Sequence, residues 1–529
     1  MKKLLLLGDE AFAQGALDAG MSGAYGYPGT PSTEIIEYIQ KNPLAEERNV
    51  HRKWSANEKT AMESAIGMSY AGKRTIVTMK HVGLNVAADP YVNSAFTGAN
   101  GGLLVAVADD PSMHSSQNEQ DSRFYAKFAL LPALEPSNQQ EAYEMAHYGF
   151  DFSEKYELPV MVRFVTRLSH SRAGIDRKAV KTENEMKLPK DKTQFILLPA
   201  VSRKRFKRLL ALQGQLIEES ENSPFNKYFE GTDKSMGIIA CGLAYNYLME
   251  NYNDNPCPYP VLKISQYPLP RKMIEKLCSE CSTILVLEDG APLVEEMIKG
   301  YLSQSVTVKG RLDNTVPRDG ELNPNIVAKA LNIKENELLE IPEIVAPRPP
   351  ALCVGCPHID TYNALKESLE PFGSGHVFSD IGCYTLGALP PYQAINSCVD
   401  MGASITMAKG AADAGLFPSI AVIGDSTFSH SGITGLLDCV NEKTNVVVVI
   451  VDNETTGMTG GQDSSALGKI EQICQGLGVE PEHIRTVLPL KRNHDEMVNI
   501  FKEEMAYNGV SVIIPRRECI QTLAKKNRK

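Results

Sequence analysis

The chain has 529 residues, of which 43% are hydrophobic and 22% charged, so it is long enough for about three or four globular domains. Its formal net charge of -10 argues against a nucleic-acid-binding protein, whose surface should be basic. The apolar segment Leu4–Leu7 is too short for a signal peptide, and no apolar run approaches the ~18 residues of a membrane span, so we expect a cytoplasmic protein. Its 11 cysteines then indicate free thiols or metal ligands rather than disulfides.

Residues 1–175 predict an α/β domain. Strands are expected at Leu4–Leu7, Thr75–Met79, Leu103–Ala108 and Val160–Val165. Thr30 lies in a turn before a predicted helix, whose N-terminus could hold an anion, although a Pro-rich capping turn is the simpler interpretation of this segment alone. Glu58 begins another predicted helix, where an acid is also favoured by the helix dipole. The polar segment 109–123 follows a strand and has the composition of a functional loop.

The middle of the chain predicts two further parts. Residues 176–232 predict a helical connector with an amphipathic helix over 203–222, and residues 233–345 predict a second α/β unit. In that unit Cys278 and Cys281 form a CxxC pair without a partner pair, which favours two ordinary thiols. The Pro-rich linker Ile341–Pro350 leads into a third α/β unit, residues 346–529.

Two apolar runs in the third unit, Ala421–Ile423 and Val446–Val451, predict buried parallel strands. Each ends in a polar cluster that contains Asp425 or Asn453. Because ligands bind at the carboxyl ends of strands in open α/β sheets, we expect these two residues on one rim. Their oxygens suit Mg²⁺, which shares its ligand shell with phosphates. Strand-end Asp and Asn are also common turn formers, but their spacing over two strands favours the metal.

Gly-rich turns elsewhere in this unit, at 380–387 and 401–404, would let backbone N–H groups approach a phosphate. With these turns the motifs are similar to those of the α subunits of indolepyruvate:ferredoxin oxidoreductases, within the 2-oxoacid:ferredoxin oxidoreductase family. The segments that carry the resemblance, in family order along the chain, are YPGTPSTEI (27–35), NEK (57–59), KHVGLNVAADP (80–90), DDPSMHSSQNEQDSR (109–123), CVGCPH (353–358), DIGCYTLG (380–387), MGAS (401–404), GDSTFSHSGI (424–433) and TGGQ (459–462).

The resemblance implies a multidomain thiamine diphosphate-binding fold. Residues 1–175 would form the pyrimidine-binding domain, 233–345 a transketolase C-terminal-like domain and 346–529 the diphosphate- and Mg²⁺-binding domain. Both binding domains are expected to be doubly wound α/β domains. In this fold the cofactor usually lies between the first and last domain types, often across a dimer interface.

The resemblance also implies individual roles. Glu58 would hydrogen-bond the aminopyrimidine ring, Thr30 would contact the substrate carboxylate, and Asp425, Asn453 and the Thr455 backbone carbonyl would bind Mg²⁺. Further cofactor contacts are expected at Gly382, Cys383, Tyr384, Met401, Gly402, Ala403, Gly424 and Ser426. His114 and Arg123 are expected near the substrate with Asp121. His430 is either a proton donor or only a helix-start residue.

The implied reaction is the oxidative decarboxylation of a 2-oxo acid to its acyl-CoA, with electrons passed to ferredoxin. The implied assembly pairs an α dimer with a small β subunit. An aryl pyruvate such as indolepyruvate is the expected substrate, and Met458 would either line the pocket for its ring or be a core residue. Two alternatives are a non-oxidative thiamine decarboxylase or carboligase, and a catalytically silent partner that keeps the fold.

The cysteine pattern of this sequence differs from the one usual in the family. The family's α subunit usually ends in a ferredoxin-like module with two clusters, and this sequence has no such cysteine run, which leaves the electron route open. Related enzymes place one [4Fe–4S] cluster beside the cofactor, and the matching cysteines here are Cys353, Cys356, Cys383 and Cys519. The alternative is that the CxxC pair only lines the cofactor pocket and that Cys519 is incidental.

Overall fold

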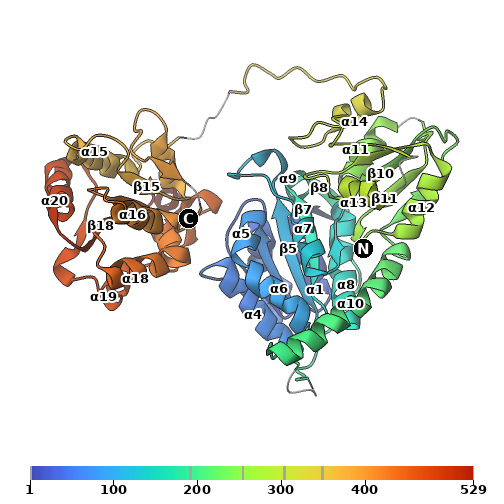
Figure 1. The fold of residues 1–529 in the computed structure, drawn as a ribbon, viewed down its shortest axis with the longest axis horizontal. Helices are drawn as coiled ribbons and strands as arrows, with labels where there is room; N and C mark the ends of the chain where they lie inside the picture. The colour runs from blue at the N-terminus through green and yellow to red at the C-terminus, as the bar shows by residue number, and fades with distance from the viewer. Residues whose placement is uncertain are drawn as a thin grey trace. The chain divides into compact units, whose positions relative to one another are not determined.

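The computed structural model describes residues 3–189, 194–252, 255–301, 306–346, 351–398 and 400–527. The chain divides into two compact units, Met1–Glu340 and Ile341–Lys529 (Figure 1). The predicted linker Ile341–Pro350 begins at this boundary, and its last four residues lie outside the described residues. The three divisions predicted before the linker therefore lie within one unit.

A seven-stranded sheet forms the centre of the first half of unit 1. Its strand order is β12 (Gln266–Tyr267), β6 (Ala133–Leu134), β7 (Val160–Val165), β5 (Leu103–Asp109), β4 (Thr75–Lys80), β2 (Gly23–Gly26) and β3 (His51–Trp54). All neighbours are parallel except β12, which pairs antiparallel with β6. The central strands β4, β5 and β7 are buried along their whole length, as expected for a parallel sheet covered on both faces.

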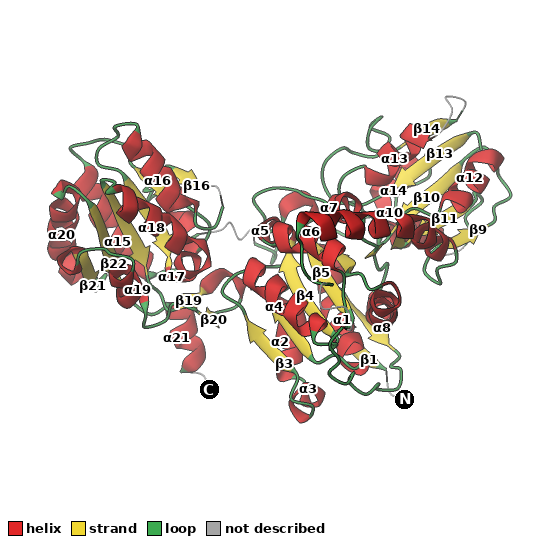
Figure 2. Ribbon diagram, turned by 60° about the horizontal axis from the view of Figure 1, so that its bottom comes forward, coloured by secondary structure: helices red, strands yellow, loops and turns green. Residues whose placement is uncertain are grey.

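Helices cover both faces of this sheet (Figure 2). One group packs together around α1 (Gly8–Asp18), α2 (Thr33–Lys41), α8 (Gln139–Tyr156) and α9 (Thr166–His170). The other group comprises α4 (Glu58–Tyr70), α5 (His81–Val86), α6 (Ala88–Thr97) and the long α10 (Pro199–Glu221). Two short helices, α3 (Pro43–Glu47) and α7 (Arg123–Ala129), complete this half.

The predicted first strand is present, but it lies outside the main sheet. Leu4–Leu7 (β1) pairs antiparallel with β8 (Arg172–Ile175) in a separate two-stranded sheet. The edge positions of the main sheet are taken by β3 and by β12, neither of which was predicted. β3 is polar (His-Arg-Lys-Trp) and β12 has only two residues, so neither shows the apolar pattern of a buried strand.

A five-stranded sheet occupies the second half of unit 1. Its strand order is β14 (Thr307–Lys309), β13 (Thr283–Leu287), β10 (Gly237–Cys241), β11 (Val261–Ile264) and β9 (Lys227–Phe229), with β9 antiparallel at the edge. Its helices are α11 (Ala244–Met249), α12 (Arg271–Glu280), α13 (Leu293–Tyr301) and α14 (Pro324–Ala330). Because β12 follows β11 in the chain and joins the seven-stranded sheet, the two halves share one continuous hydrophobic core.

Unit 2 contains a six-stranded parallel sheet. Its strand order is β16 (Ser397–Cys398), β15 (Val377–Ser379), β17 (Ile420–Gly424), β18 (Val446–Val451), β22 (Val510–Pro515) and β21 (Ile484–Val487). The helices are α15 (Pro357–Leu369), α16 (Ala403–Asp413), α17 (Asp425–Thr427), α18 (Ile433–Glu442), α19 (Ile470–Gly476), α20 (His494–Ala506) and α21 (Ile520–Lys526). A small hairpin, β19 (Thr455–Thr456) with β20 (Gln462–Asp463), follows β18.

The two faces of this sheet form two separate cores. In β18, Val447 and Val449 face one core, which α15 and α20 complete. Val448 and Ile450 face the other, which includes residues of α16 and α18. Successive side chains of a strand point to opposite faces, so an uninterrupted apolar strand supplies both cores. The predicted multidomain α/β fold is confirmed.

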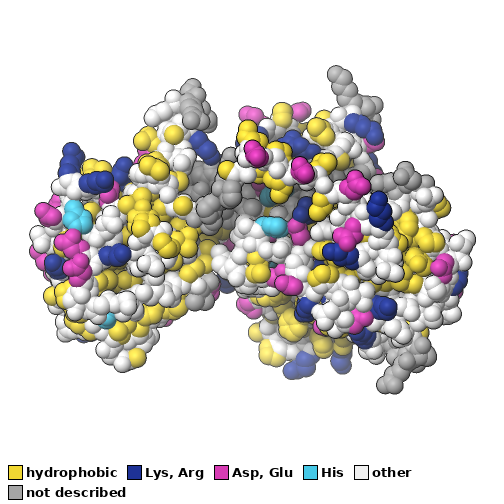
Figure 3. All heavy atoms as spheres, turned by 90° about the horizontal axis from the view of Figure 1, so that it is seen from above, with side chains coloured by type: hydrophobic (Ala, Val, Ile, Leu, Met, Phe, Trp, Pro, Cys, Tyr) yellow, Lys and Arg dark blue, Asp and Glu magenta, His cyan; other side chains and the backbone are white. Residues whose placement is uncertain are grey.

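The surface gives two further observations. On the face shown in Figure 3, the basic and acidic side chains of the described residues are interspersed. Among the described residues, no helix combines the length and apolar character that a membrane crossing requires.

Candidate active site

The predicted cofactor residues of unit 2 lie together at the carboxyl edge of the six-stranded sheet. Asp425 directly follows β17, and Asn453 follows β18, its hydrogen-bonded neighbour. The turn 380–387 follows β15, the 401–404 turn follows β16, and Cys519 comes four residues after β22. In a parallel sheet these ends share one edge, so the sheet topology gathers segments that span about 140 residues of sequence.

Asp425 has a buried environment that suits a metal ligand. The residue is 2% exposed, and its Oδ2 atom has no hydrogen-bond partner among the described residues. Burial, reinforced by the nearby Asp452, raises the pKa of Asp425 to about 7. A buried carboxylate oxygen without a partner is costly, and a divalent cation would satisfy it and restore its charge. This donor therefore fits Mg²⁺.

The loop after β18 supplies the other predicted ligands. Asn453 is 5% exposed, and its Oδ1 accepts a hydrogen bond from the Thr455 backbone N–H at 3.3 Å. The hydroxyls of Ser426 and Thr456 are 2.9 Å apart, which ties this loop to the loop after β17. The loop after β18 thus brings amide and hydroxyl oxygens to the same sheet edge as Asp425, and donors of these kinds suit Mg²⁺.

The predicted phosphate turns are built around the ring of Tyr384. A Cβ added at Gly382 or Gly424 would come within 2.2 Å or 2.5 Å of the Tyr384 Cε1 atom, so the ring lies directly on both glycines. The Tyr384 hydroxyl donates to Asp380, which is fully buried and also accepts from the Ser404 hydroxyl. These contacts hold the ends of β15 and β17 close together.

The turn after β16 packs on the segment that follows β17. Gly402 adopts φ = 98°, and an added Cβ would stand 2.5 Å from the Ser431 Cβ, so only glycine fits without strain. Its neighbours Met401 and Ala403 are half-buried. His430 is 4% exposed in a π-helical turn, Phe428–Gly432, with its Nδ1 2.5 Å from the Ser431 hydroxyl.

The four predicted cluster cysteines line one cavity of about 130 Å³. Cys353, Cys356, Cys383 and Cys519 share this cavity with Asn453 and Gly457. Burial, together with the neighbouring thiols, raises the pKa of Cys383 to about 12 and that of Cys356 to about 11. A bound cationic group would reverse this preference and favour thiolates, so four thiols in one cavity fit a [4Fe–4S] cluster in kind and number. Within the described residues, no three His, Cys, Asp or Glu side chains converge closely enough to hold a single metal ion.

His358 is a site residue that the sequence analysis did not assign. It is 2% exposed, and its Nε2 lies 3.3 Å from the Cys383 Sγ and 3.4 Å from the Asn453 Nδ2. Burial lowers the pKa of His358 to about 4, so the imidazole is neutral at pH 7. This side chain connects a predicted cluster ligand with a predicted Mg²⁺ ligand. Its position directly after the CxxC-Pro segment was the sequence feature that could have indicated His358 as a site residue.

In unit 1, Glu58 lies against the backbone of α5. The residue is 6% exposed, and a Cβ added at Gly83 would stand 2.4 Å from the Glu58 Oε1 atom. The Asn57 side chain accepts from the Thr60 backbone N–H at 2.8 Å and so fixes the start of α4. Because Gly83 has no side chain, the Glu58 carboxylate fits beside it, and the Asn57 N-cap fixes the position of Glu58.

Thr30 and the 109–123 loop meet at the carboxyl end of β4. The Ser115 hydroxyl donates to the Thr30 backbone carbonyl at 3.3 Å, and the Ser115 carbonyl accepts from Lys80 Nζ at 2.7 Å. His81 follows Lys80, with its Nε2 3.2 Å from the Asn118 carbonyl. Lys80 and His81 belong to the KHVGLNVAADP segment, and no role was predicted for either of them from the sequence.

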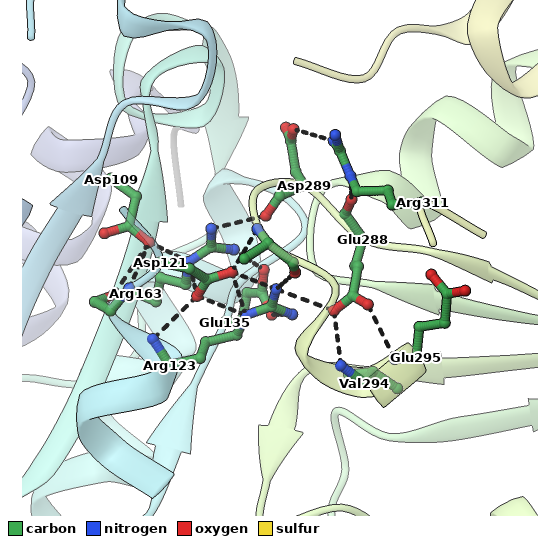
Figure 4. Close-up of polar contacts among 12 residues, drawn as sticks. Asp109, Asp121, Arg123, Glu135, Arg163, Glu288, Asp289, Val294, Glu295 and Arg311 are labelled. Carbon is green, nitrogen blue, oxygen red and sulfur yellow. Dashed lines mark hydrogen bonds and ion pairs between the residues drawn. The ribbon is translucent and has the colours of Figure 1, made fainter. Parts of the chain in front are cut away.

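Arg123 does not face an open surface. Its side chain is 1% exposed and contacts Asp121 at 2.5 Å and Glu288 at 3.0 Å. Arg123, Asp121 and Glu288 belong to a buried charge cluster between the two sheets of unit 1 (Figure 4). The cluster also contains Asp109, Glu135, Arg163, Asp289 and Arg311. This burial does not support the predicted substrate contact. Arg123 instead anchors the end of the 109–123 loop, since freeing it would leave buried carboxylates unpaired.

His114 also has a protein partner. Its side chain is 47% exposed, and its Nε2 lies 3.1 Å from the Glu321 Oε2 atom. Met458, proposed above to line the substrate pocket or to be a core residue, is 58% exposed and therefore not a core residue.

Comparisons with known proteins identify the family to which the two domains belong. Residues 14–208 match the thiamine diphosphate-binding family of pyruvate flavodoxin/ferredoxin oxidoreductases, and residues 380–514 match the C-terminal TPP-binding domain of thiamine pyrophosphate enzymes. A solved 2-oxoglutarate:ferredoxin oxidoreductase from Magnetococcus marinus is similar in fold, with a TM-score of 0.52 and 15% identity over 63% of this chain and 65% of that chain. The fold and the matched domains define a thiamine diphosphate-dependent 2-oxoacid oxidoreductase subunit.

Two relatives narrow this class. The chain is 40% identical to indolepyruvate oxidoreductase subunit IorA of Archaeoglobus fulgidus, over 98% of this chain and 86% of that protein. It is 37% identical to the subunit of the same name from Methanothermobacter thermautotrophicus, over 98% and 87%. The chain belongs to the IorA family of indolepyruvate oxidoreductase subunits.

Proposed function

We propose that this subunit catalyses the oxidative decarboxylation of an aryl pyruvate, such as indolepyruvate, to its acyl-CoA, and passes the electrons through one [4Fe–4S] cluster to ferredoxin. The relatives named as indolepyruvate oxidoreductase subunits support the substrate and a partner subunit. The observation that carries the proposal is the contact between redox-capable thiols and the thiamine site: the Asn453 Nδ2 lies 3.6 Å from the Cys383 Sγ.

Each unit carries its own residues for binding thiamine diphosphate. Asp425, Asn453 and the Thr455 carbonyl would hold Mg²⁺ and with it the diphosphate, and the glycine turns would approach the phosphate oxygens. Glu58 would hold a proton at the aminopyrimidine ring from within its buried position. Bound thiamine diphosphate supplies a nucleophilic carbon for the ketone of the 2-oxo acid and accepts the electrons left when CO₂ departs.

The protein side chains control what surrounds this chemistry. Thr30, at the turn before α2, would orient the substrate carboxylate, and the buried rim around Asp425 and Tyr384 would keep water from the reacting carbon. Cys353, Cys356, Cys383 and Cys519 would hold the cluster beside the same rim. Coenzyme A would take the acyl group after the electrons leave.

Iron content tests the oxidative proposal against a non-oxidative thiamine decarboxylase. The wild-type chain, purified anaerobically, should contain about four irons per chain and absorb broadly near 400 nm, as thiolate-bound clusters do. Cys519→Ser should lose most of this iron and the ferredoxin-reducing activity. Cys278→Ser, in the other CxxC pair, is the matched control and should keep both. An iron-free wild-type protein that still decarboxylates 2-oxo acids would support the non-oxidative alternative instead.

A further inference from the structure

A 2-oxo acid brings a carboxylate into the site, and a buried carboxylate needs a positive partner. Two basic residues of the 109–123 loop were predicted near the substrate, and both are otherwise engaged. Arg123 is buried among carboxylates, and His114 faces Glu321. The cation for the substrate therefore has to come from elsewhere in the site.

Lys80 lies where such a cation is needed. It ends β4, and its stem lies against the turn that contains Thr30, since a Cβ added at Gly29 would stand 3.1 Å from the Lys80 Cβ. Ser115 forms hydrogen bonds with both residues. Its carbonyl accepts from Lys80 Nζ, and its hydroxyl donates to the Thr30 carbonyl. Three residues further on, Gly83 lies against the Glu58 carboxylate. Lys80 thus contacts the turn that holds the residue predicted for the substrate carboxylate, and it lies three residues before the glycine that contacts the residue predicted for the cofactor ring.

The charge of Lys80 lacks a counter-ion in the described structure. Two lysines among the described residues are buried, Lys80 at 8% and Lys263 at 3% exposure. Lys263 forms an ion pair with Glu141, whereas Lys80 forms none within 4.0 Å in the described part of the chain. Of the three hydrogen atoms that an ammonium group can donate, one is used on the Ser115 carbonyl.

The acid whose charge acts on Lys80, Asp110, is committed to other partners. Asp110 accepts hydrogen bonds from the Ser116 hydroxyl at 2.6 Å, the Thr166 hydroxyl at 2.7 Å and the Ser115 backbone N–H at 2.8 Å. Burial lowers the pKa of Lys80 to about 8, and Asp110 opposes this shift only in part. The ammonium is thus held charged but poorly compensated, which an incoming anion would relieve.

From this placement we infer that Lys80 is the substrate-binding residue that receives the carboxylate of the 2-oxo acid, with Thr30 beside it. The inference rests on the proposed function for its ligand class. It identifies a specificity determinant: the site selects an acid over a neutral ketone or amide of the same shape, because a neutral ligand would leave Lys80 buried and uncompensated.

The test measures this selectivity by binding rather than by turnover. The full chain, loaded with thiamine diphosphate and Mg²⁺, is titrated calorimetrically with 3-phenylpropionate and with its neutral amide. The wild type should bind the acid more tightly than the amide. Lys80→Gln, whose amide can still donate to the Ser115 carbonyl, should lose about ten- to a hundredfold of the acid affinity and none of the amide affinity. Lys80→Arg should retain most of the preference.

Lys127→Gln removes the same charge from the exposed surface of α7 and should behave as the wild type. An unchanged acid preference in Lys80→Gln overturns the inference, and so does a wild-type chain that does not prefer the acid. Turnover of phenylpyruvate by the wild-type chain with its partner subunit is measured separately. Failure of turnover contradicts the proposed function. With turnover intact, an acid preference that is absent in the wild type or unchanged in Lys80→Gln contradicts only the role of Lys80.

Discussion

Replacing Gly83 by alanine should displace the Glu58 carboxylate without altering Glu58 itself. The added Cβ would stand 2.4 Å from the Oε1 atom, 2.8 Å from Cδ and 2.7 Å from Cγ of Glu58. Rotation of the carboxylate alone cannot relieve a contact with Cγ. Carbon atoms pack at about 3.5 Å or more, so the side chain or one helix must move by roughly 1 Å.

Both helices resist this movement. Glu58 is the first residue of α4, which the Asn57 cap fixes, and Gly83 lies inside α5, which follows directly on β4. Overpacking of this kind costs about 1–3 kcal/mol, which a folded domain tolerates. A misplacement of about 1 Å in a catalytic group costs on the order of a hundredfold in rate. We therefore expect kcat of Gly83→Ala to fall about a hundredfold at saturating thiamine diphosphate.

Gly67→Ala is the matched control. Gly67 lies exposed on the same helix as Glu58, and an added Cβ would meet nothing within 4 Å. Alanine is the better helix former, so this change should stabilise the fold by about 1 kcal/mol and leave kcat unchanged. Both variants are assayed anaerobically with the partner subunit, and their thermal unfolding is compared. If folded Gly83→Ala turns over as fast as Gly67→Ala, the position of the Glu58 carboxylate does not matter for catalysis and the proposed role of Glu58 is refuted.

Three further predictions concern buried polar and charged side chains of the two units. Burial raises the pKa of Glu288 from 4.5 to about 7. Its contribution to the free energy of unfolding is therefore complete below pH 4.5 and is lost as the pH rises through 7. Glu288→Gln should remove on the order of 3 kcal/mol of the change in unfolding free energy with pH, and an unchanged pH profile in urea unfolding would contradict this. Thiamine diphosphate with Mg²⁺ should raise the melting temperature of the wild-type chain but not that of Asp425→Asn, and an equal rise in both would exclude Asp425 as the metal ligand. His358→Leu should weaken Mg²⁺-dependent thiamine diphosphate binding about 10–100-fold in calorimetry, because its contact orients Asn453; unchanged binding would leave His358 with a packing role only.

The sequence by itself determined the strands and the rim of unit 2. An uninterrupted apolar run such as Val446–Val451 specifies a strand buried on both faces, and parallel strands place their following residues on one edge. The position of Asp425 and Asn453 at one sheet edge follows from these two local facts. The gathering of the four cysteines was expected only from the family resemblance, and the structure places all four in one cavity.

The tertiary structure alone decided the partners of the charged side chains. Lys80 ends β4, and Arg123 ends the loop that follows β5. Arg123 meets Glu288 from 165 residues away, whereas Lys80 meets no carboxylate within 4.0 Å in the described residues. Strand periodicity is a local property, whereas ion pairing depends on which distant segment packs on the same spot. The same reason explains why β1 joined β8 rather than the main sheet, and why His358 came to lie between Cys383 and Asn453.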